Sequence, residues 1–196
     1  MPAAPEEAAI NRLVQAGERV VEDGFRHATA LAARGYDRVV YLGSGALTGL
    51  AHESALKLLE LTAGRTIAYF DSALGFRHGP KSILDERSLA VIYLSNDPYT
   101  RLYDEDIAVE LRDALGPDNV LLVGARPSQR LGSLGCQLSD LDEAEDVLLS
   151  LPFAICAQTL GLQFSLALGA TPDNPFPSGE VNRVVKGVTI HPSPVE

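Results

Sequence analysis

Cysteine and histidine are scarce in this chain, and their scarcity excludes two classes of site. The 196 residues include only Cys136 and Cys156, which lack the C-x-x-C spacing of redox and zinc motifs and allow at most one disulfide. We expect them to be buried thiols in a reducing compartment. The four histidines are dispersed along the sequence, so we predict no metal centre and no cofactor.

Positive charge is also in short supply. Lysine and arginine total 16 against 26 acidic residues, which gives a net charge of −10. This balance argues against binding to nucleic acid or to an anionic membrane surface. A basic start followed by an apolar core is missing at the N-terminus, so we expect no signal peptide and a cytoplasmic location. Any phosphate site must then be a local arrangement.

One uncharged segment, residues 147–170, approaches the length of a membrane span. Pro152 interrupts this segment, and Gln158 and Gln163 break its apolarity. We therefore interpret it as a core helix over about residues 151–168, partly buried against another lobe or subunit. Such a surface would suit a homodimer or pairing with a second lobe.

Strand-like and helix-like segments alternate along most of the chain. Short apolar runs of strand length occupy residues 37–42, 66–70, 89–94, 119–123 and 135–139. They predict an α/β fold, a three-layer sandwich around a parallel, flavodoxin-like five-stranded sheet. The length suits one substantial core but not two full α/β domains. We expect an N-terminal helical segment or connector at 1–35, the α/β domain at 36–170 and a C-terminal tail at 171–196.

A glycine-rich loop, Gly43-Ser44-Gly45, joins the first strand-like run to a long helix-forming segment. Glycines let the backbone approach an anion closely, Ser44 adds a hydroxyl group, and the start of a helix presents free N–H groups. The loop is therefore a candidate contact for a phosphate or a sugar. An ordinary turn between a strand and a helix is the alternative, since such turns are common in open α/β sheets.

The helix after this loop carries its charges along one line. Leucine and alanine surround most of its axis between residues 50 and 62, whereas Glu53, Lys57 and Glu60 are spaced i, i+4 and i+7. The charged side chains form a narrow stripe that must face either solvent or a cleft. A solvated ion pair and a catalytic line explain this pattern equally well.

A histidine turn follows the next strand, in the stretch GFRHGPKS at residues 75–82. Histidine is suited to passing protons near neutral pH, and the glycine and proline after His78 hold it in a defined turn. Taken alone, His78 would more often be a structural residue. Its neighbours favour a functional role.

Together, G-S-G, E-x-A-L-K-x-x-E and R-H-G-P-K-S-I resemble the sugar isomerase (SIS) domain. The stretches GFRHGPKSI, LSNDPYTR and NPFPSGEVNRVVKGVTI are similar to the tagatose-6-phosphate ketose/aldose isomerase family, whose members include galactosamine-6-phosphate deaminase/isomerases. The isomerase domain of glucosamine-6-phosphate synthase is a more distant relative. The resemblance runs from about residue 36 to residue 191 and indicates the second SIS lobe of a two-lobed enzyme.

The resemblance implies a role for three residues. Glu60 matches the base that moves a proton between two carbons of the open-chain sugar, His78 the histidine that assists ring opening, and Lys186 a tail lysine that contacts the sugar carbonyl. Isomerisation and deamination both need such groups, for proton transfer and for stabilising the developing charge. Candidate substrate contacts are Gly43, Ser44, Gly45, Glu53, Lys57, Arg77, Ser95, Asn96, Asn182 and Arg183.

The sequence thus predicts a phosphosugar isomerase/deaminase lobe. Its substrate would be a (2-amino-)hexose 6-phosphate, such as galactosamine 6-phosphate or tagatose 6-phosphate, and the tail would act as a lid. The phosphate loop Ser-x-Ser-Gly-x-Thr of SIS lobes has no counterpart at residues 70–72 or 95–100. The alternatives are a non-catalytic sugar-phosphate-binding SIS module, the inactive half of a two-lobed enzyme, and a purely structural dimerisation lobe.

Overall fold

The computed structural model describes residues 5–174, 176–177, 179 and 189–192. The helices are α1 (Pro5–Ala32), α2 (Ala46–Leu61), α3 (Ala73–Phe76), α4 (Pro98–Leu115) and α5 (Asp146–Ala167). The strands are β1 (Arg38–Gly43), β2 (Ile67–Asp71), β3 (Ser88–Tyr93), β4 (Val120–Gly124) and β5 (Cys136–Gln137). Short 3-10 turns lie at η1 (Pro80–Ile83), η2 (Pro117–Asn119) and η3 (Ser139–Leu141).

The five strands form one sheet in the order β2-β1-β3-β4-β5, and every neighbouring pair is parallel. The predicted α/β class and five-stranded parallel sheet are confirmed. Strand β5 is shorter than the five residues expected from the sequence, because only Cys136 and Gln137 pair with β4. The chain then turns into η3, so the ladder ends there.

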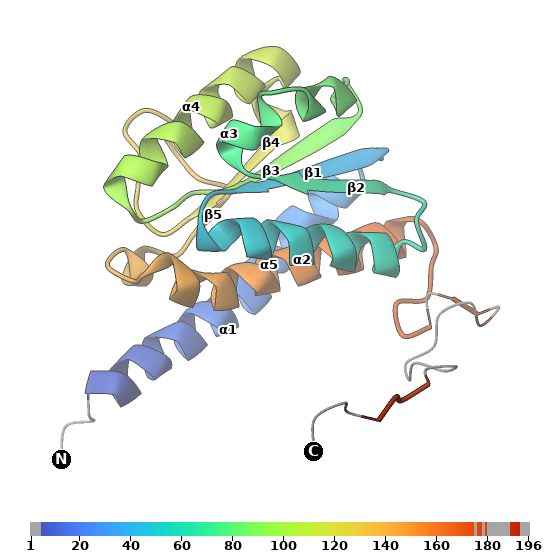
Figure 1. Ribbon diagram of the computed structural model, residues 1–196, viewed down its shortest axis with the longest axis horizontal. Coiled ribbons are helices and arrows are strands. Elements are labelled where there is room, and N and C mark those ends of the chain that lie inside the picture. The colour runs from blue at the N-terminus through green and yellow to red at the C-terminus, as the bar shows by residue number, and fades with distance from the viewer. Residues whose placement is uncertain (1–4, 175, 178, 180–188, 193–196) are drawn as a thin grey trace.

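Helices cover both faces of the sheet (Figure 1). Helices α1, α2 and α5 lie on one face, and α3 and α4 lie on the other. Successive strand residues point to opposite faces, and both faces are buried, as expected for a parallel sheet. The first core contains Val39, Tyr41, Val91, Tyr93 and Val123, and the second contains Val40, Leu42, Ile92, Leu94 and Leu122.

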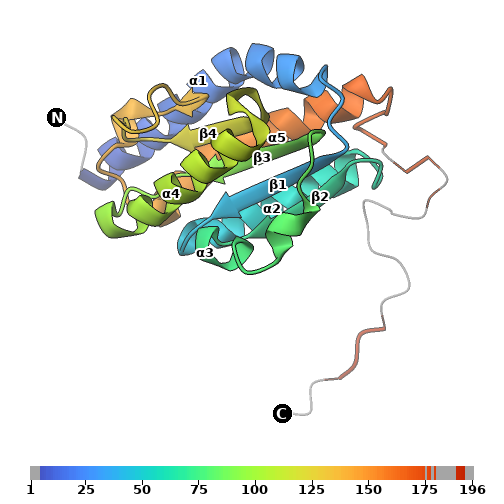
Figure 2. The same ribbon diagram turned by 90° about the horizontal axis from the view of Figure 1, so that it is seen from above.

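The N-terminal segment is a single long helix that packs on the domain. Helix α1 runs beside α5 (Figure 2) and buries one side of its length through Ala16, Val20 and Leu31. Its backbone comes close to α5 at Gly17, where an added Cβ would lie 2.8 Å from the Cδ1 atom of Ile155. This glycine therefore helps the two helices to approach.

Helix α5 is long and apolar enough to cross a membrane by length and composition alone. It begins five residues earlier than the sequence suggested and contains Pro152 within the helix. Leu149, Phe153 and Leu160 are nevertheless buried in the core between the sheet and the helices of its layer. This is the position of the core helix that we expected.

Candidate functional site

The Gly43-Ser44-Gly45 loop lies where two adjacent parallel strands, β1 and β3, end. Gly45 has φ 57° and ψ −126°, in the region that favours glycine. A Cβ on Gly43 would lie 2.4 Å from the backbone oxygen of Leu47, which leaves no room for a side chain. The strand order reverses between β1 and β3, and ligands of open α/β sheets bind at such a switch point.

A buried carboxylate from α4 joins the loops that follow β1 and β3. The Ser44 hydroxyl donates to Oδ1 of Asp104 at 2.5 Å, and the backbone N–H of Ser95 donates to Oδ2 at 2.9 Å. Asp104 is completely buried. One acidic side chain therefore occupies the space between the two loops at the switch point.

A second carboxylate, from the start of α5, binds the residues after β3. The Ser95 hydroxyl donates to Oδ2 of Asp146 at 2.5 Å, and the backbone N–H of Asn96 donates to Oδ1 at 2.8 Å. The Asn96 side chain donates to the carbonyls of Leu141 and Ala144, each at 2.8 Å. The hydroxyl of Ser95 and the backbone and side-chain N–H groups of Asn96 are thus engaged within the protein, whereas the buried Oδ1 atom of Asn96 has no partner among the described residues.

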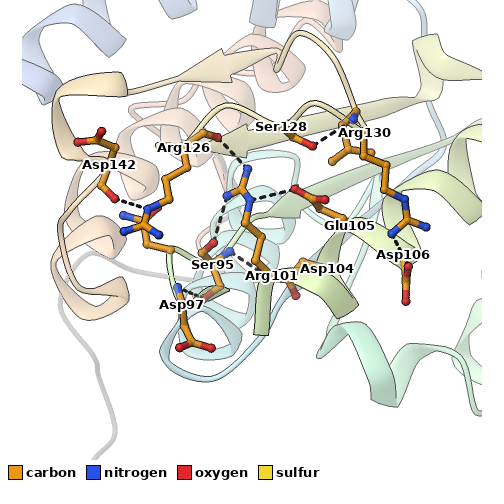
Figure 3. A network of polar contacts seen from close by, with 12 residues as sticks. Ser95, Asp97, Arg101, Asp104, Glu105, Asp106, Arg126, Ser128, Arg130 and Asp142 are labelled. Carbon is orange, nitrogen blue, oxygen red and sulfur yellow. Dashed lines mark hydrogen bonds and ion pairs between the residues drawn. The ribbon is translucent and has the colours of Figure 1, made fainter. Parts of the chain in front are cut away.

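A buried arginine completes this network (Figure 3). Arg101 donates to the backbone oxygens of Ser95 and Arg126 at 3.1 and 2.8 Å, and to Glu105 at 3.0 Å. Its guanidinium thereby connects α4 with the ends of β3 and β4. We call the group Ser44, Ser95, Asn96, Arg101, Asp104 and Asp146 the switch-point network.

Burial raises the pKa of Asp104 to about 6. The hydrogen bonds from Ser44 and Ser95 and the charge of Arg101 oppose this shift, whereas the charge of Asp146 adds to it. Asp104 therefore changes charge close to neutral pH, unlike an ordinary surface aspartate.

We expect Asp104→Asn to remove a pH-dependent part of the stability. The pKa of Asp104 is about 6 in the folded state, whereas the ordinary value for an aspartate is 3.8. Folding is therefore accompanied by the uptake of a proton between these two pH values. Relative to the variant, the wild type should lose up to about 3 kcal/mol as pH rises from about 4 to about 7. Urea unfolding across this range measures the difference. Asp113→Asn, on the exposed part of the same helix, is the control. Parallel pH profiles for the wild type and Asp104→Asn would contradict the assignment.

The predicted stripe forms on the outer side of α2. Nζ of Lys57 lies 2.7 Å from Oε2 of Glu60 and 3.6 Å from Oε1 of Glu53. The hydrogen bond to Glu60 raises the pKa of Lys57, and the charges of both carboxylates act in the same direction. The side chains of Glu53, Lys57 and Glu60 remain 53%, 33% and 41% exposed, so a ligand can reach all three.

The histidine turn lies at the end of α3. Phe76 is buried and anchors the turn, whereas Arg77 and His78 are exposed. The Arg77 guanidinium lies 3.0 Å from Oε2 of Glu110 on α4, and Lys81 binds the other oxygen of this carboxylate. The predicted substrate contact Arg77 is therefore held by α4.

These predicted residues do not meet at one point within this chain. Helix α2 covers one face of the sheet and α3 the other, so Glu60 and His78 lie on opposite faces. Glu60 is also 14 residues along α2 from Ala46, which corresponds to about 21 Å. It is therefore remote from Ser44. Asn182, Arg183 and Lys186 lie outside the described residues.

Three residues of the switch-point network were not among our sequence-based candidates: Arg101, Asp104 and Asp146. Arg101 and Asp104 share a helical face with the buried Ile107, Ala108 and Leu111. Charged residues in phase with an apolar face are expected to be buried and paired, so this spacing was a usable signal. For Asp146, by contrast, the sequence offers no such pattern.

No family model matches the chain. A Streptomyces coelicolor protein, provisionally named as the D-galactosamine-6-phosphate deaminase AgaS, is 54% identical over 183 residues, or 92% of this chain and 48% of that protein. The D-galactosamine-6-phosphate deaminase AgaS of Shewanella sp. (strain ANA-3) is 39% identical over 189 residues, or 96% of this chain and 46% of that protein.

Solved structures agree with these relatives. A Clostridium novyi protein, provisionally named as a tagatose-6-phosphate ketose/aldose isomerase, has a TM-score of 0.87 and 40% identity, and the match covers 94% of this chain and 48% of that one. The sheet order, the glycine loop and these likenesses define an SIS domain. The chain belongs to the family of tagatose-6-phosphate ketose/aldose isomerases and galactosamine-6-phosphate deaminases. It spans about half the length of the curated relatives that it matches.

Proposed function

We propose that this chain is the proton-transfer lobe of a phosphosugar isomerase/deaminase acting on a 2-amino-hexose 6-phosphate such as galactosamine 6-phosphate. The observation that carries this proposal is the exposed Glu53-Lys57-Glu60 line on α2, with Lys57 between two carboxylates. Relatives named for galactosamine-6-phosphate deamination and tagatose-6-phosphate isomerisation support the choice of substrate.

In the proposed reaction, His78 assists opening of the sugar ring. Glu60 then takes a proton from the carbon next to the carbonyl and returns it to the neighbouring carbon. Lys186 contacts the carbonyl oxygen and stabilises the negative charge that develops there. With an amino sugar, the same proton transfer produces an enolamine, which becomes an imine and releases ammonia on hydrolysis.

We further propose that the complete site needs a second surface, which is a first SIS lobe or another copy of this chain. Glu60 and His78 lie on opposite faces of the sheet, so one substrate cannot bridge them within a single lobe. Either partner could supply the missing contacts. A phosphate clamp would come from the same second surface.

A turnover assay with galactosamine 6-phosphate tests the proposed function. We expect release of ammonia and formation of tagatose 6-phosphate, measured for this chain and for the chain mixed with a first SIS lobe from a relative. The sugar phosphate should also raise the melting temperature, since a ligand that binds the native state stabilises it. Failure to release ammonia or interconvert the sugar in either preparation would contradict the enzymatic proposal.

A non-catalytic sugar-phosphate-binding module is the second candidate. The Gly43-Ser44-Gly45 loop favours it, because the loop lies at the switch point between β1 and β3, where ligands of open α/β sheets bind. A rise in melting temperature without turnover would indicate this module. An unchanged melting temperature at millimolar sugar phosphate would indicate a structural lobe instead.

A further inference from the structure

The two cysteines of the chain are in contact where α5 packs on β5, on the face of the sheet that α1, α2 and α5 cover. Cys136 lies on β5 and Cys156 on α5, and they are 20 positions apart in the sequence. Their Sγ atoms are 3.0 Å apart. Both are free thiols, as the sequence predicted, but they are partly rather than fully buried. Neither has a place in the proposed sugar chemistry.

We propose that Cys136 and Cys156 form a reversible disulfide when the protein meets a hydroperoxide. A disulfide needs a sulfur–sulfur distance of about 2.05 Å, so the two Sγ atoms must approach by about 1 Å. Small adjustments of two side chains achieve this, because the sulfurs already contact each other. The two cysteines lie on different elements, so their closeness comes from the packing of the fold and not from closeness in the sequence.

A cavity gives a small oxidant access to both sulfurs. Its volume is about 180 Å³, and its lining includes Cys136, Cys156, Thr159, and Asp23 and His27 of α1. A cavity needs only about 10–15 Å³ to hold one water molecule, so a hydroperoxide fits easily. The polar groups in the lining make the cavity suitable for a small polar molecule.

The two sulfurs have different roles. The hydrogen bond from the Cys156 thiol lowers the pKa of Cys136, whereas the same contact raises the pKa of Cys156 well above its ordinary value. The thiolate is the nucleophilic form of cysteine. Cys136 is therefore the attacking residue, and Cys156 is the resolving residue.

The reaction balances in two steps. The Cys136 thiolate attacks one peroxide oxygen, the O–O bond breaks, and Cys136 becomes a sulfenic acid while the other oxygen leaves and is protonated to an alcohol or water. The sulfur of Cys156 then attacks the sulfenic sulfur, an S–S bond forms, and the sulfenic oxygen leaves as water with the Cys156 proton. Two thiols are oxidised and one hydroperoxide is reduced.

The disulfide would link β5, an edge strand of the sheet, covalently to α5. Strand β5 pairs only through two register positions with β4, so this edge has few backbone hydrogen bonds to hold it. A bridge to α5 closes a loop of about 20 residues and restrains its opening. From the usual effect of such loops, we expect the melting temperature to rise by about 5–10 °C on oxidation.

Intact-mass measurement of the wild type tests the proposal without any substitution. After treatment with stoichiometric hydrogen peroxide and blocking of free thiols, we expect a monomer with no blocked cysteine and a mass lower by two hydrogen atoms. A thiol reductant should restore both free thiols and the original melting temperature. Two blocked thiols, stable over-oxidation of one cysteine, or a disulfide only between molecules would each overturn it.

Single substitutions test the order of attack. Cys156→Ser should accumulate a sulfenic acid on Cys136 that a dimedone probe labels, and its melting temperature should not rise with peroxide. Cys136→Ser should give much weaker labelling. Stronger labelling of Cys136→Ser than of Cys156→Ser would overturn the assigned roles. None of these readouts depends on sugar turnover, so they stand apart from the proposed function.

Discussion

Glu60→Gln should lower the turnover of galactosamine 6-phosphate at least a hundredfold. A positioned general base contributes about 10²–10⁴ to a rate, and glutamine keeps the shape of the side chain but cannot take a proton. The fold should survive, because Glu60 is 41% exposed and its contact is a surface ion pair with Lys57. The rate of ammonia release under saturating substrate, in the assembly that turns the sugar over, measures the effect.

Glu22→Gln is the matched control, since Glu22 is an exposed helical glutamate on α1, away from the stripe. It should keep the wild-type rate. The melting temperature of Glu60→Gln, measured beside the rate, separates a lost base from a lost fold. A Glu60→Gln variant that works as fast as the wild type would remove Glu60 from the mechanism while leaving the family assignment intact.

The sequence predicted the centre of the sheet well because both faces of β1, β3 and β4 are apolar. In β1 and β3, residues such as Val39, Val40 and Ile92 are all buried, so a continuous apolar run indicates a central parallel strand. Strand β5 carried no such signal, and its length depends on how long β4 can pair with it. Its end is therefore a tertiary effect that local sequence does not encode.

The candidate site was predictable only where it follows a local spacing. The stripe of Glu53, Lys57 and Glu60 follows from helical periodicity alone. The contact between Ser44 and Asp104 joins residues 60 positions apart, and that between Ser95 and Asp146 joins residues 51 apart. Such pairs depend on how α4 and α5 pack against the end of the sheet.

Residues that are close in sequence can also lie on opposite faces of the sheet when a strand separates them. Glu60 and His78 are separated by only β2, the short helix α3 and their connections, yet α2 and α3 pack on opposite faces of the sheet. A compact motif in the sequence thus becomes two separate surfaces in the fold. This arrangement is the physical reason for proposing that a second lobe or subunit completes the site.

Gly43→Ala should destabilise the domain by at least about 2 kcal/mol, because overpacking against backbone cannot be relieved by a side-chain rotation. The added Cβ would lie 2.4 Å from the backbone oxygen and 2.7 Å from the carbonyl carbon of Leu47. Leu47 belongs to the first turn of α2 and is itself completely buried. Removing this close contact would require α2 to move away from the core. Urea unfolding measures the loss.

Gly49→Ala makes the same change within α2, at a position where there is room for a side chain. No atom lies within 4 Å of a Cβ at Gly49, and the residue is exposed. This substitution should stabilise the domain by about 0.5–1 kcal/mol, since alanine favours helix more than glycine. Equal stabilities for the two variants would show that the loop tolerates a side chain at Gly43. The predicted contrast means that Gly43 is required by the packing of α2 on β1, so the glycine loop is needed for the fold whether or not a sugar binds there.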